Sequence, residues 1–517
     1  MWGPMLRRLI AFVILMLPLP AFAEWHEAST ENFRVIADQS EKDVAKFAER
    51  LEKFHDALIW ILDRDPSTPS PSNRVTIYVV RSDNEVQKLA GDKTGFLRGF
   101  YRPRAGGSLA FIARVQGAGN EISRSEQVLY HEYAHHVMQG ASEWASPRWL
   151  SEGFAEFFST ARFEKNGGVG LGLPAYHRAG ELAFARNVPI DILLDSQAYR
   201  REKSRRYDEF YGRSWLLYHY LQLSGNRRGQ LNNYRLALAK GASEMEAAIS
   251  AFGDLLQLDK ELQIYLDARK MNYISVPAEK LNVGPITTRK LSSGEAAMMA
   301  IVLESKRGVN REAAKALLTK AKPIAAQFPQ DPGVLSALAE AEQDAGNYDA
   351  AITAADRAIS IDPKQINAYV QKILAASAKA RDAEDSETAW KTVRRAATTL
   401  NKQEADHPIP LIYYYLSYQN AGTDIPELAT QGLKRALELA PYDRNVRWQV
   451  VKQLIDDEEW ATAYRILMPI ANDPHNQSDD NPAIALMASV KAQLEALSKP
   501  TMQAAEAESK VKNTPAS

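Results

Sequence analysis

Residues 122–139 carry the sequence ISRSEQVLYHEYAHHVMQ, and the interpretation of the whole chain starts from this stretch. Ser123 followed three residues later by Glu126 forms a capping-box pattern, which is typical of a helix start. No Pro or Gly follows before Gly140. The spacing therefore predicts one helix that begins near Ser123 and ends near Gly140.

This helix carries an HExxH pattern at residues 131–135. Residues four apart lie on the same face of a helix, so His131 and His135 can bind one metal ion together. Glu132 is rotated by about 100° from His131. Its carboxylate then lies beside the metal, where it can accept a proton from water that the metal holds. His136 lies off this face, which favours a packing or supporting role.

A catalytic zinc site needs a third protein ligand, and we expect it within residues 146–158, SPRWLSEGFAEFF. The Ser-Pro start is typical of a helix N-terminus, and Glu152 and Glu156 then share one face of this second helix. Carboxylates among aromatic side chains are costly to bury without a cation or a donor. We expect Glu152 to be the third ligand and Glu156 to accept the outer N–H of His131, with solvent-exposed acids as the alternative. Gly153 is expected to let this helix approach the HExxH helix closely.

HExxH followed at this distance by Trp-x-x-Glu-Gly-x-Ala resembles the gluzincin zinc metallopeptidases, and most closely the peptidase MA-like family of secreted bacterial proteins. The resemblance covers residues 24–275 and implies an α+β zincin-like domain, a small mixed sheet with active-site helices. It implies one Zn2+ per chain on His131, His135 and Glu152. It also implies that Glu132 is the general base for hydrolysis of a polypeptide substrate. The GxMEN motif of aminopeptidases is missing, which favours an endopeptidase.

In these enzymes a Tyr or His from a later segment stabilises the oxyanion. Residues 207–221, YDEFYGRSWLLYHYL, are similar to the Tyr-x-x-Ser-x-x-Leu-x-x-Tyr-Leu helix of MA-like proteins, with Tyr211 at the leading position. The resemblance thus implies a catalytic role for Tyr211. A core or surface position is the alternative, because other tyrosines compete for this role: Tyr207, Tyr218 and Tyr220.

Strand and helix patterns alternate before the HExxH segment. Runs rich in β-forming residues at 32–37, 74–80 and 108–115 predict strands, and residues 42–62 have helical periodicity. We therefore expect an α+β domain over residues 24–275.

From residue 291 the chain changes to Ala-rich helical pairs. Residues 332–363 match a tetratricopeptide repeat (TPR) because small and apolar residues stand at its packing positions: Leu335, Leu338, Ala339, Gly346, Tyr348, Ala351, Ala358 and Pro363. The chain resembles the TPR family over residues 291–497, with another α-solenoid as the alternative. This resemblance implies a groove for a protein partner. We expect residues 276–290 to be a linker and residues 498–517 a disordered polar tail.

Residues 1–23 have a basic start, an apolar stretch and a small-x-small cleavage site, the three parts of a secretory signal peptide. A membrane anchor is the alternative, but two prolines interrupt the apolar run, which is also short for a bilayer. We expect no membrane span in the mature chain. Secretion across the inner membrane of a bacterium would place the protein in the periplasm, with the extracellular medium as the alternative.

The chain has 63 basic and 64 acidic residues, a net charge of −1, and this balance argues against a nucleic-acid partner. It contains no cysteine, which excludes disulfides, a Cys nucleophile and Cys-ligated metals. These patterns favour a secreted zinc metallopeptidase whose TPR region binds substrate or partner proteins. The alternative is a non-catalytic TPR adaptor that carries a zinc-stabilised, peptidase-like domain.

Overall fold

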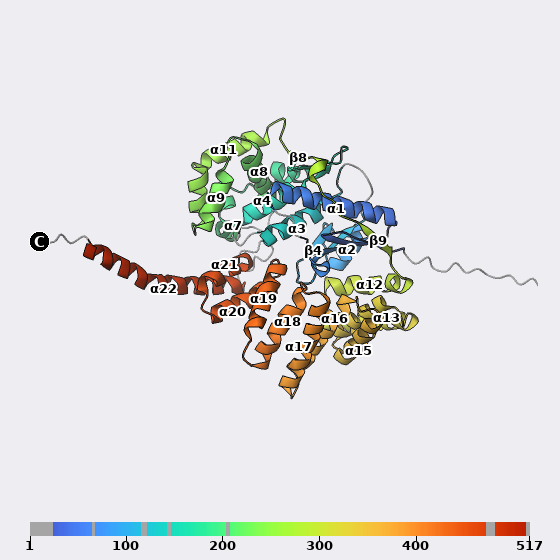
Figure 1. The fold of residues 1–517 in the computed structure, drawn as a ribbon. Helices are drawn as coiled ribbons and strands as arrows, with labels where there is room; N and C mark the ends of the chain where they lie inside the picture. Colours follow the sequence, from blue (N-terminus) through green and yellow to red (C-terminus); the bar gives the residue numbers. More distant parts are fainter. Residues whose placement is uncertain are drawn as a thin grey trace, which may run out of the picture.

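The computed structural model describes residues 24–64, 68–114, 121–141, 146–202, 207–471 and 481–512, with side chains as far as residue 497. Figure 1 shows an N-terminal domain that lies against a curved stack of helices. The predicted signal peptide, residues 1–23, lies outside the described residues. None of the helices in the described part of the chain has the length and apolar character needed to span a membrane.

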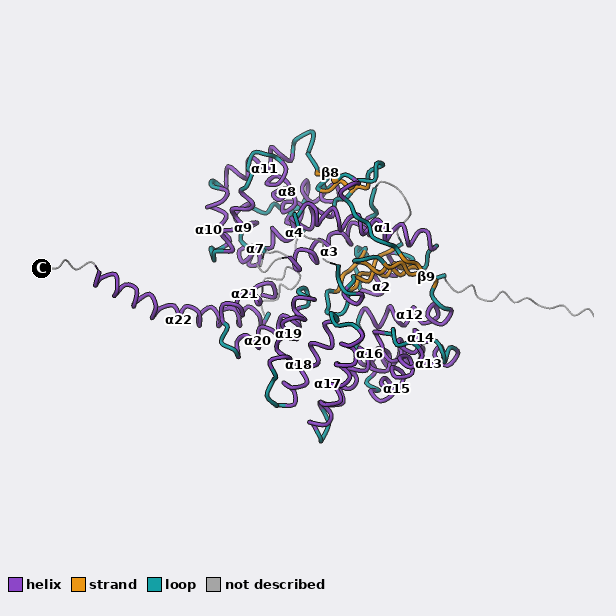
Figure 2. The backbone as a smooth tube through the Cα atoms, in the orientation of Figure 1, coloured by secondary structure: helices purple, strands orange, loops and turns teal. Residues whose placement is uncertain are grey.

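A six-stranded mixed sheet forms the centre of the N-terminal domain (Figure 2). Its strands are β1 (His26–Ser29), β2 (Phe33–Ala37), β3 (Val75–Val80), β4 (Gly99–Arg102), β5 (Leu109–Ala113) and β9 (Thr287–Lys290). Their order across the sheet is β4-β5-β3-β2-β1-β9. β3 pairs in parallel with β2 and β5, and the other pairs are antiparallel.

The segment 276–290, which the sequence predicts as a linker, is part of this sheet. β9 pairs antiparallel with β1, and Thr288 lies opposite Ala28. Its sequence, TTRK, has no apolar alternation, because an edge strand needs few buried side chains. The domain therefore extends to Lys290, beyond the expected boundary at residue 275.

Two helices cover one face of the sheet, α1 (Glu41–Ile61) and α3 (Arg124–Ala141), which carries the HExxH motif. Side chains alternate between the two faces of a strand, so every second residue of the inner strands joins the core under these helices. The strand residues in this core include Val35, Ala37, Ile77, Val79, Ala110 and Ile112. The core thus holds α3 against the sheet.

The opposite face of the sheet is covered by α2 (Asp83–Ala90) and α12 (Ser293–Arg307). Met299 and Leu303 of α12 are buried there. They share a core with the other set of alternating strand residues: Ile36, Tyr78, Val80, Leu109, Phe111 and Ala113. The helical region therefore begins on the sheet itself.

Beyond α3 the N-terminal domain is mainly helical. α4 (Arg148–Ser159) packs against both α3 and α8 (Phe210–Leu223). A second, antiparallel sheet consists of β6 (Arg162–Phe163), β7 (Val169–Leu171) and β8 (Ile274–Val276). The remaining helices are α5 (Ala179–Phe184), α6 (Ile190–Leu194), α7 (Ser196–Glu202), α9 (Gln230–Ala239), α10 (Glu244–Phe252) and α11 (Leu255–Leu266).

The C-terminal region is an all-α solenoid of helical hairpins, which confirms this part of the predicted fold class. After α12 it comprises α13 (Arg311–Gln327), α14 (Pro332–Ala345), α15 (Tyr348–Ile361), α16 (Ile366–Arg381), α17 (Ser386–Gln403), α18 (Pro408–Ala421), α19 (Glu427–Leu439), α20 (Arg444–Asp456), α21 (Trp460–Ala471) and α22 (Pro482–Lys512). Consecutive helices from α12 to α20 pack on one another, and α12, α14, α16 and α18 also pack in series as one layer.

Helix α22 differs from the expectation for the C-terminus. The sequence predicts a disordered tail from residue 498, but the backbone is helical to Lys512. Ala and Lys are the commonest residues from 498 to 512, and both favour helices even where few apolar residues are available for packing.

The solenoid contacts the N-terminal domain at several loops. The N–H and hydroxyl groups of Ser72 donate to the Glu404 carboxylate at 2.9 and 2.7 Å. The backbone N–H of Ala105, between β4 and β5, donates to Asp443 at 2.6 Å. The repeats are therefore packed onto the domain and are not a separate module on a free linker.

Candidate metal centre

The helix that carries HExxH starts where the capping box predicts. The N–H of Ser123 donates to Glu126 at 2.8 Å, and the N–H of Glu126 donates to the Ser123 hydroxyl at 3.1 Å. Arg50 of α1 pairs with the same carboxylate at 2.9 Å. These contacts anchor the first turn of α3 and so place His131, about two turns later, beside α4.

Helices α3 and α4 bring the three predicted metal ligands together. The Nε2 atoms of His131 and His135 are 3.2 Å apart, and each lies 3.4 Å from Oε2 of Glu152. Within the described residues, this is the one group of three or more such side chains that could hold a metal ion.

The dimensions of this three-donor cluster, His131, His135 and Glu152, fit zinc. Tetrahedral zinc with bonds of about 2.0–2.1 Å keeps its ligand atoms about 3.3 Å apart. Glu152 is 0% exposed, and apart from the two imidazoles its carboxylate has no polar partner among the described residues. A buried carboxylate with so few donors is costly. A cation bound between the three groups would remove this cost.

The three-donor cluster also favours positive charge electrostatically. Burial alone would lower the pKa of His131, but its contacts with Glu152 and Glu156 outweigh burial and raise this pKa to about 10. Burial opposes ionisation of Glu152, yet the two histidines hold the pKa of its carboxyl well below its usual range. A metal ion must therefore compete with a proton on His131, so metal affinity should fall progressively as the pH drops below about 10.

Glu156 lies on the outer side of His131. Its Oε1 is 3.2 Å from His131 Nδ1, the hydrogen bond that the sequence predicts for this pair. Its Oε2 is 2.7 Å from Nε2 of His177, and Arg178 donates to Oε1. The last two residues were not anticipated, because no motif marks them and they lie more than 20 residues downstream of Glu156.

His135 has its own support on α4. The hydroxyl of Ser151 is 3.3 Å from His135 Nδ1, and both residues are buried. Such contacts orient a ligand imidazole toward its metal. Sequence reasoning missed Ser151, although its position directly before Glu152 on the same helix is a usable signal.

Glu132 and His136 occupy different environments. Glu132 is half-buried, and the structure shows no hydrogen bond or ion pair of its carboxylate within the described residues, so the carboxylate is not engaged elsewhere. His136 contacts Tyr101 through Nδ1 and packs against the rings of Tyr133 and Tyr442. His136 thus packs between the sheet and the solenoid, in agreement with a packing role.

Tyr211 lies at the start of α8, near the three-donor cluster. The negative charge of Glu152, together with burial, raises the pKa of Tyr211 to about 12, so its hydroxyl stays protonated at neutral pH. Arg148 donates to this hydroxyl at 3.4 Å, and the Arg178 guanidinium lies 4.9 Å from the ring centroid. Tyr211 is therefore able to donate a hydrogen bond to a developing anion near Glu152.

The three competing tyrosines lie in other environments. Tyr207 is 68% exposed. The Tyr218 hydroxyl accepts a hydrogen bond from Gln222, and the Tyr220 hydroxyl donates to Glu261 at 2.8 Å. Tyr211 is thus the tyrosine of this segment whose pKa responds to the charge of Glu152.

The sequence predicts that Gly153 lets α4 approach α3 closely, and this prediction is wrong about the helix that Gly153 contacts. A Cβ atom at this position would lie 2.5 Å from the backbone oxygen of Ser214 and 3.0 Å from Tyr218 Cβ. Gly153 therefore permits close packing of α4 on α8, and not on α3. Gly153 faces α8 because its neighbour Glu152, the expected ligand, already occupies the face of α4 that points to α3.

We expect Gly153→Ala to lower the free energy of unfolding by about 1–3 kcal/mol, because the added methyl group forces α4 away from α8. Zinc affinity should fall with it, since Glu152 moves with α4. Thermal unfolding and zinc titration check both effects. Gly180→Ala is the matched control, because a Cβ at this helical glycine meets nothing within 4 Å. Equal stability of the two variants would contradict the packing argument.

Comparisons with known proteins find similarity in solved structures only. No protein-family model matches the chain, and no curated protein matches it. A thermophilic TPR protein of Thermus thermophilus is 18% identical and covers 39% of this chain and 100% of its own, with a TM-score of 0.32. Pseudomonas aeruginosa pilF is 12% identical, and the match covers 42% of this chain and 100% of pilF, with a TM-score of 0.29. Yeast Tom70 is 15% identical, and the match covers 65% of this chain and 70% of Tom70, with a TM-score of 0.28. At these TM-scores the similarity assigns no activity.

Proposed function

We propose that the protein is a secreted, zinc-dependent metallopeptidase that hydrolyses internal peptide bonds of polypeptide substrates. The observation that carries this proposal is the three-donor cluster of His131, His135 and Glu152, whose separations of 3.2 to 3.4 Å suit one zinc ion. Glu132, with no ion pair among the described residues, follows the first ligand directly on the same helix. The resemblance of the two helical motifs to the gluzincin and peptidase MA-like families supports the same assignment.

His131, His135 and Glu152 would hold the zinc ion. When bound, zinc acts as a Lewis acid that lowers the pKa of water at its open coordination position. The Glu132 carboxylate accepts a proton from the attacking water and passes it to the leaving amine. The Tyr211 hydroxyl donates a hydrogen bond to the oxyanion of the tetrahedral intermediate. Glu156 and Ser151 keep the two imidazoles in their binding orientation.

The solenoid supports a second part of the proposal, the binding of a protein partner or substrate. Stacked helical hairpins build an extended surface that suits polypeptide ligands. The proposed location is the periplasm or the extracellular medium, which rests on the signal peptide expected at residues 1–23.

The alternative is an adaptor in which zinc only stabilises the fold. Its support is the close packing of the solenoid on the domain, for example the Ser72–Glu404 contacts, which would make the domain part of a scaffold. Against it stands Glu132, which a structural zinc site does not require.

Metal removal tests both functions. The purified mature protein should contain about one zinc per chain and should cleave an unfolded protein such as reduced casein. A strong chelator should abolish cleavage and lower the melting temperature, because zinc binds the folded state, and added zinc should restore both. A zinc-loaded protein that cleaves neither casein nor a diverse peptide library would favour the adaptor. A protein that binds no zinc would contradict both functions.

A further inference from the structure

A cavity of about 1340 Å³ lies between the second face of the sheet and the solenoid. The sheet contributes Ile36, Tyr78 and Leu109, which face away from α3, and the solenoid contributes residues of α12, α14 and α16. The metal centre is on the other face of the sheet. Ligand sites usually occupy about 300–1,000 Å³, so this interdomain cavity has room for a segment of polypeptide.

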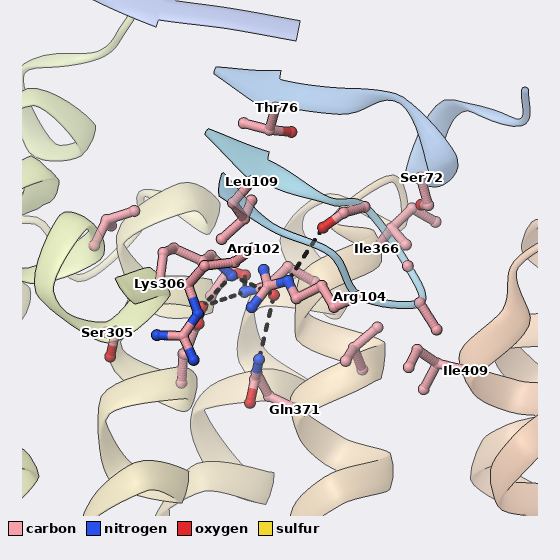
Figure 3. A pocket seen from close by; sticks show the side chains of 18 of the residues that line it. Ser72, Thr76, Arg102, Arg104, Leu109, Ser305, Lys306, Ile366, Gln371 and Ile409 are labelled. Carbon is pink, nitrogen blue, oxygen red and sulfur yellow. Dashed lines mark hydrogen bonds and ion pairs between the residues drawn. The ribbon is translucent and has the colours of Figure 1, made fainter. Parts of the chain in front are cut away.

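Three cations gather in one part of the interdomain cavity: Arg102 at the end of β4, Arg104 in the loop that follows, and Lys306 of α12 (Figure 3). Neither arginine forms an ion pair within the described residues, and the Arg104 guanidinium donates to the backbone oxygen of Gly107 at 3.1 Å. Lys306 pairs with Glu340 at 2.6 Å. By contrast, two other arginines that line the cavity, Arg34 and Arg289, both pair with Glu27.

The two arginines bring positive charge to the cavity. Burial raises the pKa of a nearby acid, Asp344, to about 6 although Arg104 opposes this effect, and Asp344 forms no ion pair with Arg104 among the described residues. Arg102 is an exposed residue, yet partial desolvation lowers its pKa, and the charges of Arg104 and Arg307 lower it further. Burial also lowers the pKa of Lys306, and Arg104 adds to this effect although Glu340 opposes it. An anionic group bound among these cations would relieve their repulsion, and arginine binds carboxylates through two parallel hydrogen bonds.

The interdomain cavity also contains a buried acceptor that needs a donor. The Asn367 oxygen Oδ1 faces the ammonium of Lys306 at 3.1 Å, and its amide nitrogen faces Glu340. Because an ammonium only donates and a carboxylate only accepts, this amide orientation is determined. The Gln371 nitrogen therefore donates to Asn367 at 3.2 Å, which leaves Gln371 Oε1 without a partner although the residue is 4% exposed.

We propose that the interdomain cavity binds an acidic peptide segment. A carboxylate of the peptide contacts Arg102, Arg104 and Lys306, and a peptide N–H donates to Gln371 Oε1. A peptide supplies both groups along one chain and has a size that suits a cavity of about 1340 Å³, which a single phosphate ion would leave largely unfilled. Apolar side chains along the cavity suit the peptide's other residues: Met298, Val302, Val370 and Ile409. This inference rests on the proposed function, because it specifies the kind of polypeptide that the solenoid region would bind. The site is formed only where the N-terminal domain and the solenoid meet.

Binding is tested on the full mature chain with Glu132→Gln, so that no probe is cleaved. The probe is a fluorescein-labelled decapeptide of Glu, Ala and Leu, with a Lys, Ala and Leu peptide for comparison. We expect the acidic peptide alone to bind, and Arg102→Ala or Arg104→Ala to weaken it at least tenfold. Gln371→Leu should weaken it severalfold. Arg235→Ala, an exposed arginine on α9, is the matched control and should have no effect.

Three outcomes would overturn the proposal: equal binding of acidic and basic peptides, unchanged affinity in both arginine variants, or phosphate binding as tight as that of the peptide. Thermal unfolding of each variant identifies a loss of fold. Cleavage of a short neutral peptide by Arg104→Ala in the otherwise unchanged protein separates this site from the peptidase proposal. If no variant cleaves the peptide but the acidic peptide still binds as expected, the peptidase proposal fails and the binding proposal stands.

Discussion

Glu132→Gln should retain zinc and lose almost all peptidase activity. General-base catalysis contributes about a hundredfold to ten-thousandfold, and we expect kcat to fall within this range. The amide of Gln cannot accept the proton of the attacking water at neutral pH. Glu132 makes no hydrogen bond or ion pair among the residues that the structure describes, so the fold should not suffer.

The measurement compares steady-state cleavage of a quenched fluorescent peptide with zinc content and melting temperature. Glu121→Gln is a suitable control, because this exposed residue lies just before α3 and contacts Arg50 through its backbone oxygen. The control should match the wild type in all three measurements. Activity of Glu132→Gln within tenfold of the wild type would remove the general-base assignment.

Glu152→Gln should lose zinc, whereas Glu156→Gln should retain it at saturating metal. Gln at position 152 replaces an anionic ligand with a neutral amide in a fully buried position, so zinc affinity and cleavage should both nearly vanish. Loss of a residue that only orients a ligand typically costs about 10–100-fold in affinity or activity. Glu156→Gln should show a loss of this size, because His131 keeps its place on α3.

Zinc titration with a competing chromophoric chelator measures both affinities. Glu156→Gln also removes the negative charge beside Arg178, but the Arg178 guanidinium still pairs with Glu181 at 3.0 Å. Thermal unfolding of the metal-free variants therefore separates loss of fold from loss of metal. If Glu156→Gln cannot be metallated and Glu152→Gln can, the third ligand lies one helical turn later than proposed.

The local parts of this structure could be predicted from the sequence because they depend on short-range spacing. The capping box places the start of α3, and the four-residue interval places His131 and His135 on one face. The same interval aligns Glu152 with Glu156 on α4. Runs rich in β-forming residues likewise identify β2, β3 and β5.

The relations between elements could be predicted only in part. The resemblance of the two motifs implied that Glu152 meets both histidines, and the structure places it 3.4 Å from each. Nothing in the local pattern pointed to His177 and Arg178 beside Glu156, because they reach it through a chain reversal after α4. The position of Gly153 on α4 was clear, but its close neighbour was assigned to the wrong helix.

The sequence by itself determined the helices, their faces and the residue types that can bind zinc, since these follow from backbone periodicity and side-chain chemistry. Tertiary structure alone decided which faces meet. β9 forms one edge of the sheet from a segment without a strand pattern. The solenoid packs on the second face of the sheet, where it encloses the cavity with Arg102 and Arg104. Such contacts join residues hundreds of positions apart, such as Ala105 and Asp443. Their geometry depends on how the two cores pack together, which no local spacing encodes.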